Sequence, residues 1–125
     1  MKILSKTPVD LIQQQVNAYN ARDIKAFLAT YSPDIQIYNH PDSLLYSGLD
    51  QMETVYSRLF KNNPKLHGEI VNRIVLGNFV IDQERVTGFP NDRVINAVAI
   101  YEVKDSLIIK FGLFGNRLKQ KTSEK

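Results

Sequence analysis

Two periodicities of apolar residues divide the chain. In the first half, apolar positions recur every three or four residues, which is the period of a helix with one buried face. After Pro64 the apolar positions alternate or run together, and many of them are β-branched, as is typical of strands. The pattern therefore predicts helices first and a sheet after them.

Three stretches carry the helical period. The first follows Thr7, a candidate N-cap, and Asp10 supplies the carboxylate of a capping box. Asp23 can cap a second, short helix over 24–31, and the third helix is predicted over 49–62. The apolar stripe of the first helix is Val9, Ile12, Val16 and Tyr19, and that of the third is Met52, Val55, Tyr56, Leu59 and Phe60.

The second half predicts long strands joined by short turns. Gly77-Asn78 is a turn pair of the hairpin type, and residues 104–106 turn the chain again. Earlier, a turn at 32–34 leads into a short strand at 35–38, and a brief extended piece is expected at 44–46. Helices on one face of an antiparallel sheet make an α+β domain. The long strands are expected at 65–76, 79–88, 93–103 and 107–114.

Several predicted strands carry apolar residues on both faces. The segments 70–76, 94–100 and 107–114 show this pattern. One face of the sheet can cover the helices, but the other then exposes more apolar surface than a monomer usually carries. A homodimer formed sheet to sheet is the simplest solution.

Composition and charge limit the classes of protein to which the chain could belong. The 125 residues predict a single domain over 1–116, followed by a basic, flexible tail over 117–125. The tail holds four of the 16 Lys and Arg but one of the 13 Asp and Glu, so the net charge of +3 belongs to it. We therefore expect no nucleic-acid partner. The chain has no cysteine, no apolar run long enough to span a membrane and no recognisable signal peptide, so a cytoplasmic location without membrane association is expected.

The order of elements resembles the nuclear-transport-factor-2-like (NTF2-like) superfamily, in its SnoaL-like branch. That superfamily also contains ketosteroid isomerases and polyketide cyclases. The similar phrases are "AYNARDIKAFLATYSPDIQIYN", "SGLDQMETVYSRLF", "NRIVLGNFVIDQERVTG", "AVAIYEV" and "FGLFG", which together cover about residues 8–115. The resemblance implies a cone-shaped NTF2-like/cystatin-like α+β fold. Three N-terminal helices would pack on a curled, mainly antiparallel sheet around a pocket, usually in a homodimer.

The same resemblance allows ketosteroid isomerase activity to be considered residue by residue. Ketosteroid isomerases use an aspartate base at the end of the first strand. Their oxyanion hole combines a helix tyrosine with a protonated aspartic acid on a strand. These three positions correspond to Asn39, Gln15 and Ala99 here. An amide does not take up a proton at neutral pH, and alanine donates no hydrogen bond. The resemblance thus implies pocket amides at Gln15 and Asn39 without the isomerase triad.

The stretch "DQER" offers two sets of candidates, because neighbouring residues of a strand face opposite sides. Alignment to the isomerases turns Gln83 and Arg85 into the pocket, where an arginine would anchor an anion or a carbonyl. Arg85 could instead pair with Glu69 across the sheet. With the opposite parity, Asp82 and Glu84 become the acid–base candidates.

Two histidines complete the candidate chemistry. His40 could act as a general base near neutral pH, or it could cap a turn together with Asn39. Only one of these two residues can face the pocket, and we favour Asn39. His67 and Glu69 could supply half of a metal site, but two histidines and no cysteine leave the set incomplete, so no metal is predicted.

We therefore expect a protein that binds a small, largely apolar molecule in the cone and needs no cofactor. The alternative is a proton-transfer enzyme, namely an isomerase, cyclase or dehydratase acting next to a carbonyl. A third hypothesis is a pure interaction module. The sequence leaves open whether the chain is an enzyme. The expected pocket residues are Gln15, Tyr19, Asn39, Tyr56, Gln83, Arg85, Tyr101 and Phe114, and the catalytic candidates are His40, Asp82 and Glu84.

Overall fold

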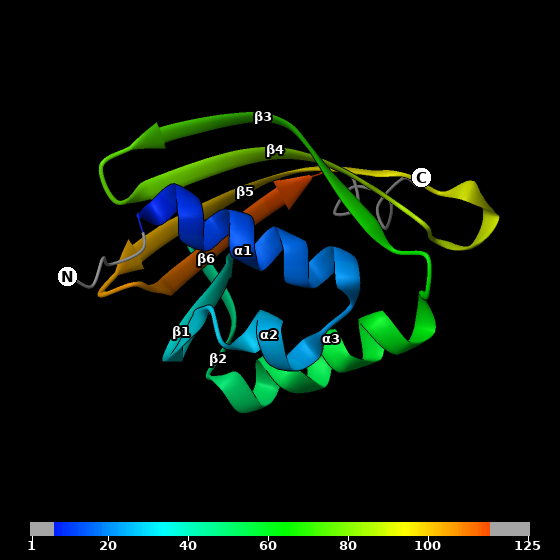
Figure 1. Ribbon diagram of the computed structural model, residues 1–125, viewed down its shortest axis with the longest axis horizontal. Helices are drawn as coiled ribbons and strands as arrows, with labels where there is room; N and C mark the ends of the chain where they lie inside the picture. Colours follow the sequence, from blue (N-terminus) through cyan, green and yellow to red (C-terminus); the bar gives the residue numbers. More distant parts are fainter. Residues whose placement is uncertain (1–6, 116–125) are drawn as a thin grey trace, which may run out of the picture.

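Helices cover one face of a curled sheet in the computed structural model, which describes residues 7–115 (Figure 1). The tail predicted over 117–125 lies outside the described residues. The helices are α1 (Pro8–Ala21), α2 (Ile24–Leu28) and α3 (Leu49–Asn62), and a 3-10 turn, η1 (Pro90–Asp92), precedes β5. The strands are β1 (Tyr31–Asn39), β2 (Ser43–Ser47), β3 (His67–Leu76), β4 (Phe79–Thr87), β5 (Ile95–Lys104) and β6 (Leu107–Gly115).

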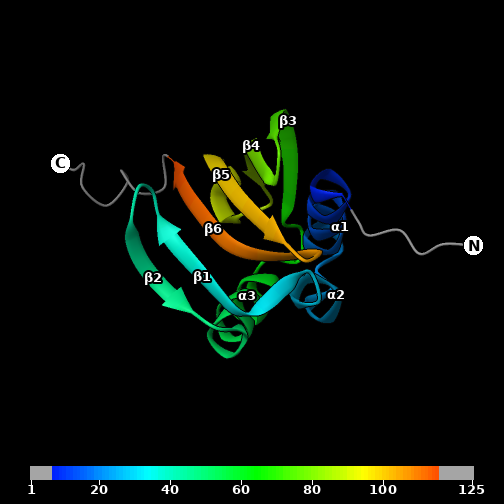
Figure 2. The ribbon, with the colours of Figure 1, turned by 90° about the vertical axis from the view of Figure 1, so that its left-hand side faces the viewer.

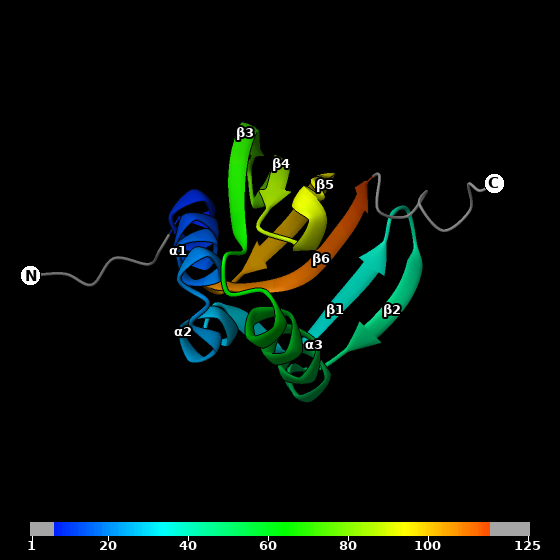
Figure 3. The ribbon, with the colours of Figure 1, turned by 90° about the vertical axis from the view of Figure 1, so that its right-hand side faces the viewer.

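The sheet joins both halves of the chain. Its strand order is β2-β1-β6-β5-β4-β3, with β1 parallel to β6 and every other neighbouring pair antiparallel. Figure 2 and Figure 3 show the sheet curving from β2 round to β3, with the helices on its concave side. The predicted α+β class and the curled, mainly antiparallel sheet are confirmed.

The helix ends follow the capping residues of the sequence. The Thr7 hydroxyl oxygen accepts the Asp10 N–H at 3.1 Å, and Asp23 accepts the Ala26 N–H at 3.1 Å. Helix α3 has the predicted bounds. Helix α2 is shorter than predicted: the chain leaves it after Leu28.

The region after α2 differs from the prediction because of strand pairing. Tyr31 pairs with Ile108 of β6, so it belongs to β1 and not to the helix. The turn expected at 32–34 lies inside β1, where the register to β6 shifts between Tyr31 and Gln36. This irregularity accommodates Pro33, which has no N–H to donate to the sheet.

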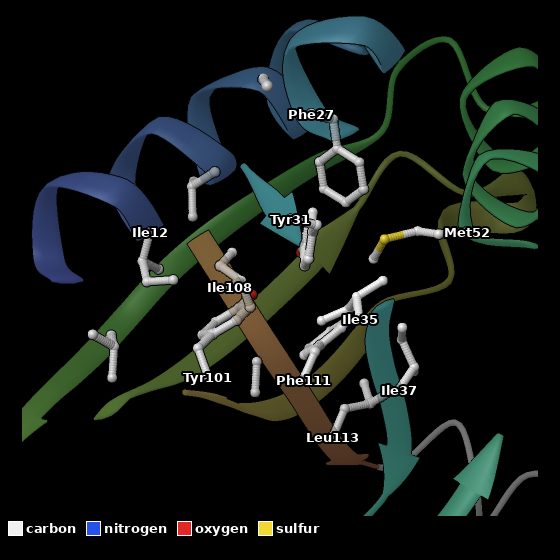
Figure 4. Close-up of a cluster of buried hydrophobic side chains, with 14 of the residues drawn as sticks. Ile12, Phe27, Tyr31, Ile35, Ile37, Met52, Tyr101, Ile108, Phe111 and Leu113 are labelled. Atoms are coloured by element: carbon white, nitrogen blue, oxygen red, sulfur yellow. The ribbon is translucent and has the colours of Figure 1, made fainter. Parts of the chain in front are cut away.

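The core lies between the helices and the concave face (Figure 4). Phe27 of α2, Met52 of α3 and Tyr31 of β1 are fully or almost fully buried. The rings of Tyr101 and Phe111 stack at 5.0 Å between centroids, with an interplanar angle of 8°. Burial of each such side chain contributes about 1.5–3 kcal/mol to stability. These aromatic side chains therefore make up a large part of the core between the sheet and the helices.

Candidate functional site

A cavity of about 560 Å³ remains between the helices and the sheet. This volume is typical of sites for small ligands. Helices α1 and α3, strands β3 to β6 and the segment after β4 contribute to its wall. The aliphatic part of the wall is formed by Val16, Leu59, Ile70, Val86, Ile95 and Leu113.

Three tyrosines expected in the pocket line this cavity. Tyr19 comes from α1, Tyr56 from α3 and Tyr101 from β5. The rings of Tyr19 and Tyr56 meet edge to face, with centroids 6.5 Å apart. Rings held in this way present both apolar faces and polar edges to a bound molecule. Their contact with a ligand stays a prediction.

Gln15 brings an amide to the cavity wall. The side chain projects from α1 and is 5% exposed, and its Oε1 atom is buried without a hydrogen-bond partner. Leaving such an atom unpaired costs about 1–3 kcal/mol. A bound molecule that offers a hydrogen-bond donor to this oxygen would remove this cost. Gln15 thus lies where the sequence placed a pocket amide.

The face of β4 that points inward is the opposite of the one that the alignment to the isomerases favoured. Glu84 lines the cavity and Asp82 is fully buried, whereas Gln83 and Arg85 are exposed and absent from the wall. The expectation that Gln83 and Arg85 face the pocket is therefore wrong. Arg85 instead has its Nη1 atom 3.9 Å from Glu69 Oε1, as in the cross-strand alternative.

Glu84 is the only carboxylate on the cavity wall within the described part of the chain. The Tyr101 hydroxyl donates to its Oε2 atom over 3.4 Å. Burial raises the pKa of Tyr101 well above its usual value, and the nearby charge of Glu84 raises it further. The phenol therefore keeps its proton at neutral pH. Glu84 is the one catalytic candidate of the sequence that reaches the cavity.

Asp82 has a structural environment instead. Its two oxygens accept hydrogen bonds from Arg73 Nε at 2.6 Å and Arg73 Nη2 at 2.8 Å. Arg73 Nη1 also donates to Gln13 Oε1 at 3.0 Å. The hydrogen bond to Asp82 raises the pKa of Arg73. These hydrogen bonds connect α1, β3 and β4 and keep Asp82 off the cavity wall. The prediction of Asp82 as an acid or base in the pocket is therefore wrong.

The remaining candidates lie outside the cavity wall. Asn39 faces inward opposite Leu113, and its Oδ1 atom is buried without a partner, but it does not line the cavity. His40 and Phe114 lie on the convex side, with ring centroids 5.1 Å apart. Phe114 points outward because its neighbour Leu113 points inward. The expectation that Phe114 lines the pocket is therefore wrong, and the catalytic candidate His40 does not reach the cavity.

Phe89 and Arg93 are among the wall residues that sequence reasoning missed. Phe89 and Arg93 line the cavity from the segment around η1, where the prediction left Phe89 between two strands and placed Arg93 at the start of a strand. The Arg93 guanidinium lies over the Phe89 ring, 4.9 Å from its centroid. An aromatic residue and a cation flanking a short proline turn were the only signal, because loops have no periodicity that predicts side-chain direction.

Residues 7–115 contain neither a metal-binding cluster nor a membrane-spanning helix. No group of three or more His, Asp or Glu side chains is placed to hold a metal ion. His67 and Glu69, the half-site of the sequence, are both exposed. No helix in this range is long and apolar enough to cross a membrane.

Comparisons with known proteins agree on the architecture. A cystatin-fold protein from Novosphingobium aromaticivorans is 20% identical, with a TM-score of 0.80, and the match covers 87% of this chain and 98% of that one. A proposed SnoaL-like polyketide cyclase from Jannaschia sp. CCS1 is 19% identical, with a TM-score of 0.76 and coverage of 98% and 94%. A protein with a ketosteroid isomerase-like fold from Catenulispora acidiphila, in complex with trimethylamine, is 14% identical, with a TM-score of 0.73 and coverage of 87% and 86%.

Sequence comparison assigns the family. No protein with a curated description matches the chain. The model of the SnoaL-like domain matches residues 12–111, which include all three helices except the start of α1 and all strands except the end of β6. The chain therefore belongs to the SnoaL-like domain family and has the cone-shaped α+β fold of NTF2-like proteins.

Proposed function

We propose that the protein binds a small, largely apolar molecule in the cavity of the cone. The observation that carries the proposal is the unpartnered amide oxygen, Oε1, of Gln15 in a wall that is otherwise mainly apolar and aromatic. Apolar walls favour burial of a ligand by about 25 cal/mol per Å² of apolar surface, and a few polar groups fix its orientation. A neighbour of the same fold holds trimethylamine, which supports a small-molecule role for such cones.

Fluorescence of N-phenyl-1-naphthylamine, a neutral apolar probe, tests this proposal. Ala97→Phe extends a ring from β5 into the cavity, and Val98→Phe adds the same ring on the convex face. We expect the Ala97→Phe variant to bind the probe at least about tenfold more weakly, a loss of about 1.4 kcal/mol, and the Val98→Phe variant to bind normally. Equal binding by both variants would place the probe elsewhere and contradict the proposal.

The proposal includes a homodimer formed through the convex face of the sheet. Ile74, Ile81 and Ile100 lie side by side across β3, β4 and β5, and Val98 lies opposite Phe114 on β6. Ile74 is 55% exposed and Phe114 is 40% exposed. Such a continuous apolar surface favours self-association.

Sedimentation velocity distinguishes this face from other exposed apolar residues. We expect a dimer for the unmodified protein and a monomer for Ile100→Lys. Val55→Lys introduces the same charge at an exposed apolar position of α3 and should leave the dimer intact. A monomeric unmodified protein, or dissociation by Val55→Lys alone, would contradict the proposed interface.

Glu84 favours a second candidate function, proton transfer next to a carbonyl. In that reaction the carboxylate takes a proton from the carbon beside the carbonyl group, and the electron pair moves to the carbonyl oxygen as an enolate. The Gln15 amide N–H could donate to that oxygen, and the Tyr101 hydroxyl could do so only by giving up its hydrogen bond to Glu84. The base would thus sit on β4 and not at the end of β1.

Exchange of the α-protons of 2-indanone in D2O, followed by NMR, measures this activity. General-base catalysis by a positioned carboxylate accelerates exchange by about 10²- to 10⁴-fold, and Glu84→Gln should remove that acceleration. Glu69→Gln changes an exposed carboxylate of β3 and should have no effect. Exchange no faster than in buffer would exclude this activity on 2-indanone and leave the binding proposal untouched.

A further inference from the structure

The cavity reaches solvent at Arg93. Among the described residues of its wall, Arg93 alone is exposed, whereas Glu84 is half-buried and Gln15 is buried. The guanidinium is held at this rim by the face of the Phe89 ring, 4.9 Å away. Such a cation–π contact favours one position of the guanidinium.

A second hollow, of about 630 Å³, adjoins this rim. Phe89 and Arg93 belong to the walls of both hollows. The second hollow extends from the end of α3 to the η1 segment, and Figure 3 looks onto this side of the molecule. Its wall includes the cations Lys65, Arg85 and Arg93 and the single carboxylate of Asp92. The mouth of the cavity is thus positive, whereas the charged group further in, Glu84, is negative.

We propose that the ligand has an anionic head group, a carboxylate or a phosphate, that binds Arg93 at the mouth while its apolar body fills the cavity. The inference rests on the proposed binding function and adds the class and the orientation of the ligand. A guanidinium binds such oxygens through two parallel hydrogen bonds. Lys65 adds positive potential beside the mouth, whereas Arg85 shares its charge with Glu69.

Glu84 sets the direction of insertion. An anionic head group next to Glu84 would bring two negative charges together in a poorly hydrated space, which is costly. At Arg93 the same group keeps its contact with water. A ligand of this class therefore enters with its apolar end first, and its body lies beside the tyrosines. A donor group at the inner end of that body would pair with Gln15 Oε1.

Four octyl compounds that differ only in their head group test the inference. Octanoate, octyl phosphate, octanol and octylamine each compete with N-phenyl-1-naphthylamine for the full-length protein at pH 7. We expect both anions to displace the probe at concentrations about tenfold lower than octanol, and octylamine to be the weakest competitor. Octanoate and octyl phosphate also show which of the two anionic groups fits the mouth better.

Variants assign the preference to Arg93. Arg93→Gln should remove the advantage of the anions over octanol, whereas Arg58→Gln, at an exposed arginine of α3 that lines neither hollow, should preserve it. Equal displacement by all four compounds would overturn the inference and leave the binding function standing. A preference for octylamine that Glu84→Gln abolishes would also overturn it, because the head group would then point inward. Failure of the probe itself to bind the cavity would overturn both proposals.

Discussion

Asp82 and Glu84 lie two residues apart on the same face of β4, yet their surroundings differ completely. Asp82 is fully buried and holds Arg73 through two hydrogen bonds. Glu84 lines the cavity and accepts from Tyr101. The difference comes from β3, where Arg73 is opposite Asp82 and Ile70 is opposite Glu84. The partner strand therefore decides which carboxylate is held in an ion pair and which lines the cavity.

A shift of register makes this arrangement possible. Ile70 and Arg73 are an odd number of residues apart, so in a regular strand they would face opposite sides. The register between β3 and β4 shifts between Ile70 and Asn72, and both side chains then face the concave side. The closed, ion-paired region around Asp82 and the open cavity around Glu84 are neighbours because of this irregularity.

Removing the ion pair between Arg73 and Asp82 should have the largest effect on stability. Arg73→Met leaves the buried carboxylate of Asp82 without its cation, which should lower the free energy of unfolding by about 3–5 kcal/mol. Urea denaturation measures this loss, and Arg58→Met is a matched exposed control. The double variant Arg73→Met with Asp82→Leu should recover most of the stability. A loss below about 1 kcal/mol for Arg73→Met would show that the pair is not a clamp.

The buried phenols of Tyr31 and Tyr101 should make the stability of the protein sensitive to alkali. Burial raises the pKa of both Tyr31 and Tyr101 well above the usual value near 10, and neighbouring groups raise it further: Tyr56 for Tyr31 and Glu84 for Tyr101. The unfolded chain ionises first as pH rises, so stability is complete below pH 10 and is lost as pH rises above it. Each phenol contributes a slope of up to about 1.4 kcal/mol per pH unit.

Absorbance near 295 nm follows phenolate formation in this experiment. The chain has six tyrosines, and Tyr31 and Tyr101 should ionise only together with the loss of folded structure seen by circular dichroism. Reversible ionisation of all six tyrosines in the folded protein would contradict the burial of these two phenols.

Changing the open region should have the smallest effect on stability. Glu84→Gln preserves the size of the side chain and an oxygen that can accept from Tyr101. The free energy of unfolding should therefore change by less than about 0.5–1 kcal/mol, within the range of substitutions outside the packed core. The same urea titration measures it. A loss comparable to that of Arg73→Met would make Glu84 a second structural carboxylate and remove the contrast.

Periodicity predicted the fold well because it reports burial directly. Helix α3 has its predicted bounds, and Gln15, Tyr19, Tyr56 and Tyr101 line the cavity as expected. Strand direction was less predictable. A displacement of one residue in an alignment exchanges the two faces of a strand, which turned Gln83 and Arg85 inward in the prediction and outward in the structure.

Loop residues were beyond any periodic pattern. Phe89 and Arg93 reach the cavity because η1 folds back toward the end of α3, and nothing in their spacing indicates this. For Asn39 the prediction failed in another way. The side chain faces inward as predicted, but the cavity does not extend to it. The alternation of the strand predicts the direction of this side chain, whereas the extent of the cavity depends on the packing of its neighbours.

The central claim is that the concave cavity, and not the convex face, takes the apolar ligand. Methyl NMR of the isotope-labelled protein during a titration with octanoate tests it most directly. The methyl groups of Ile70, Val86 and Leu113, which line the cavity, should shift, while those of Ile74 and Ile100 on the convex face should not. Shifts confined to Ile74 and Ile100 would place the ligand on the outside of the sheet and contradict the account.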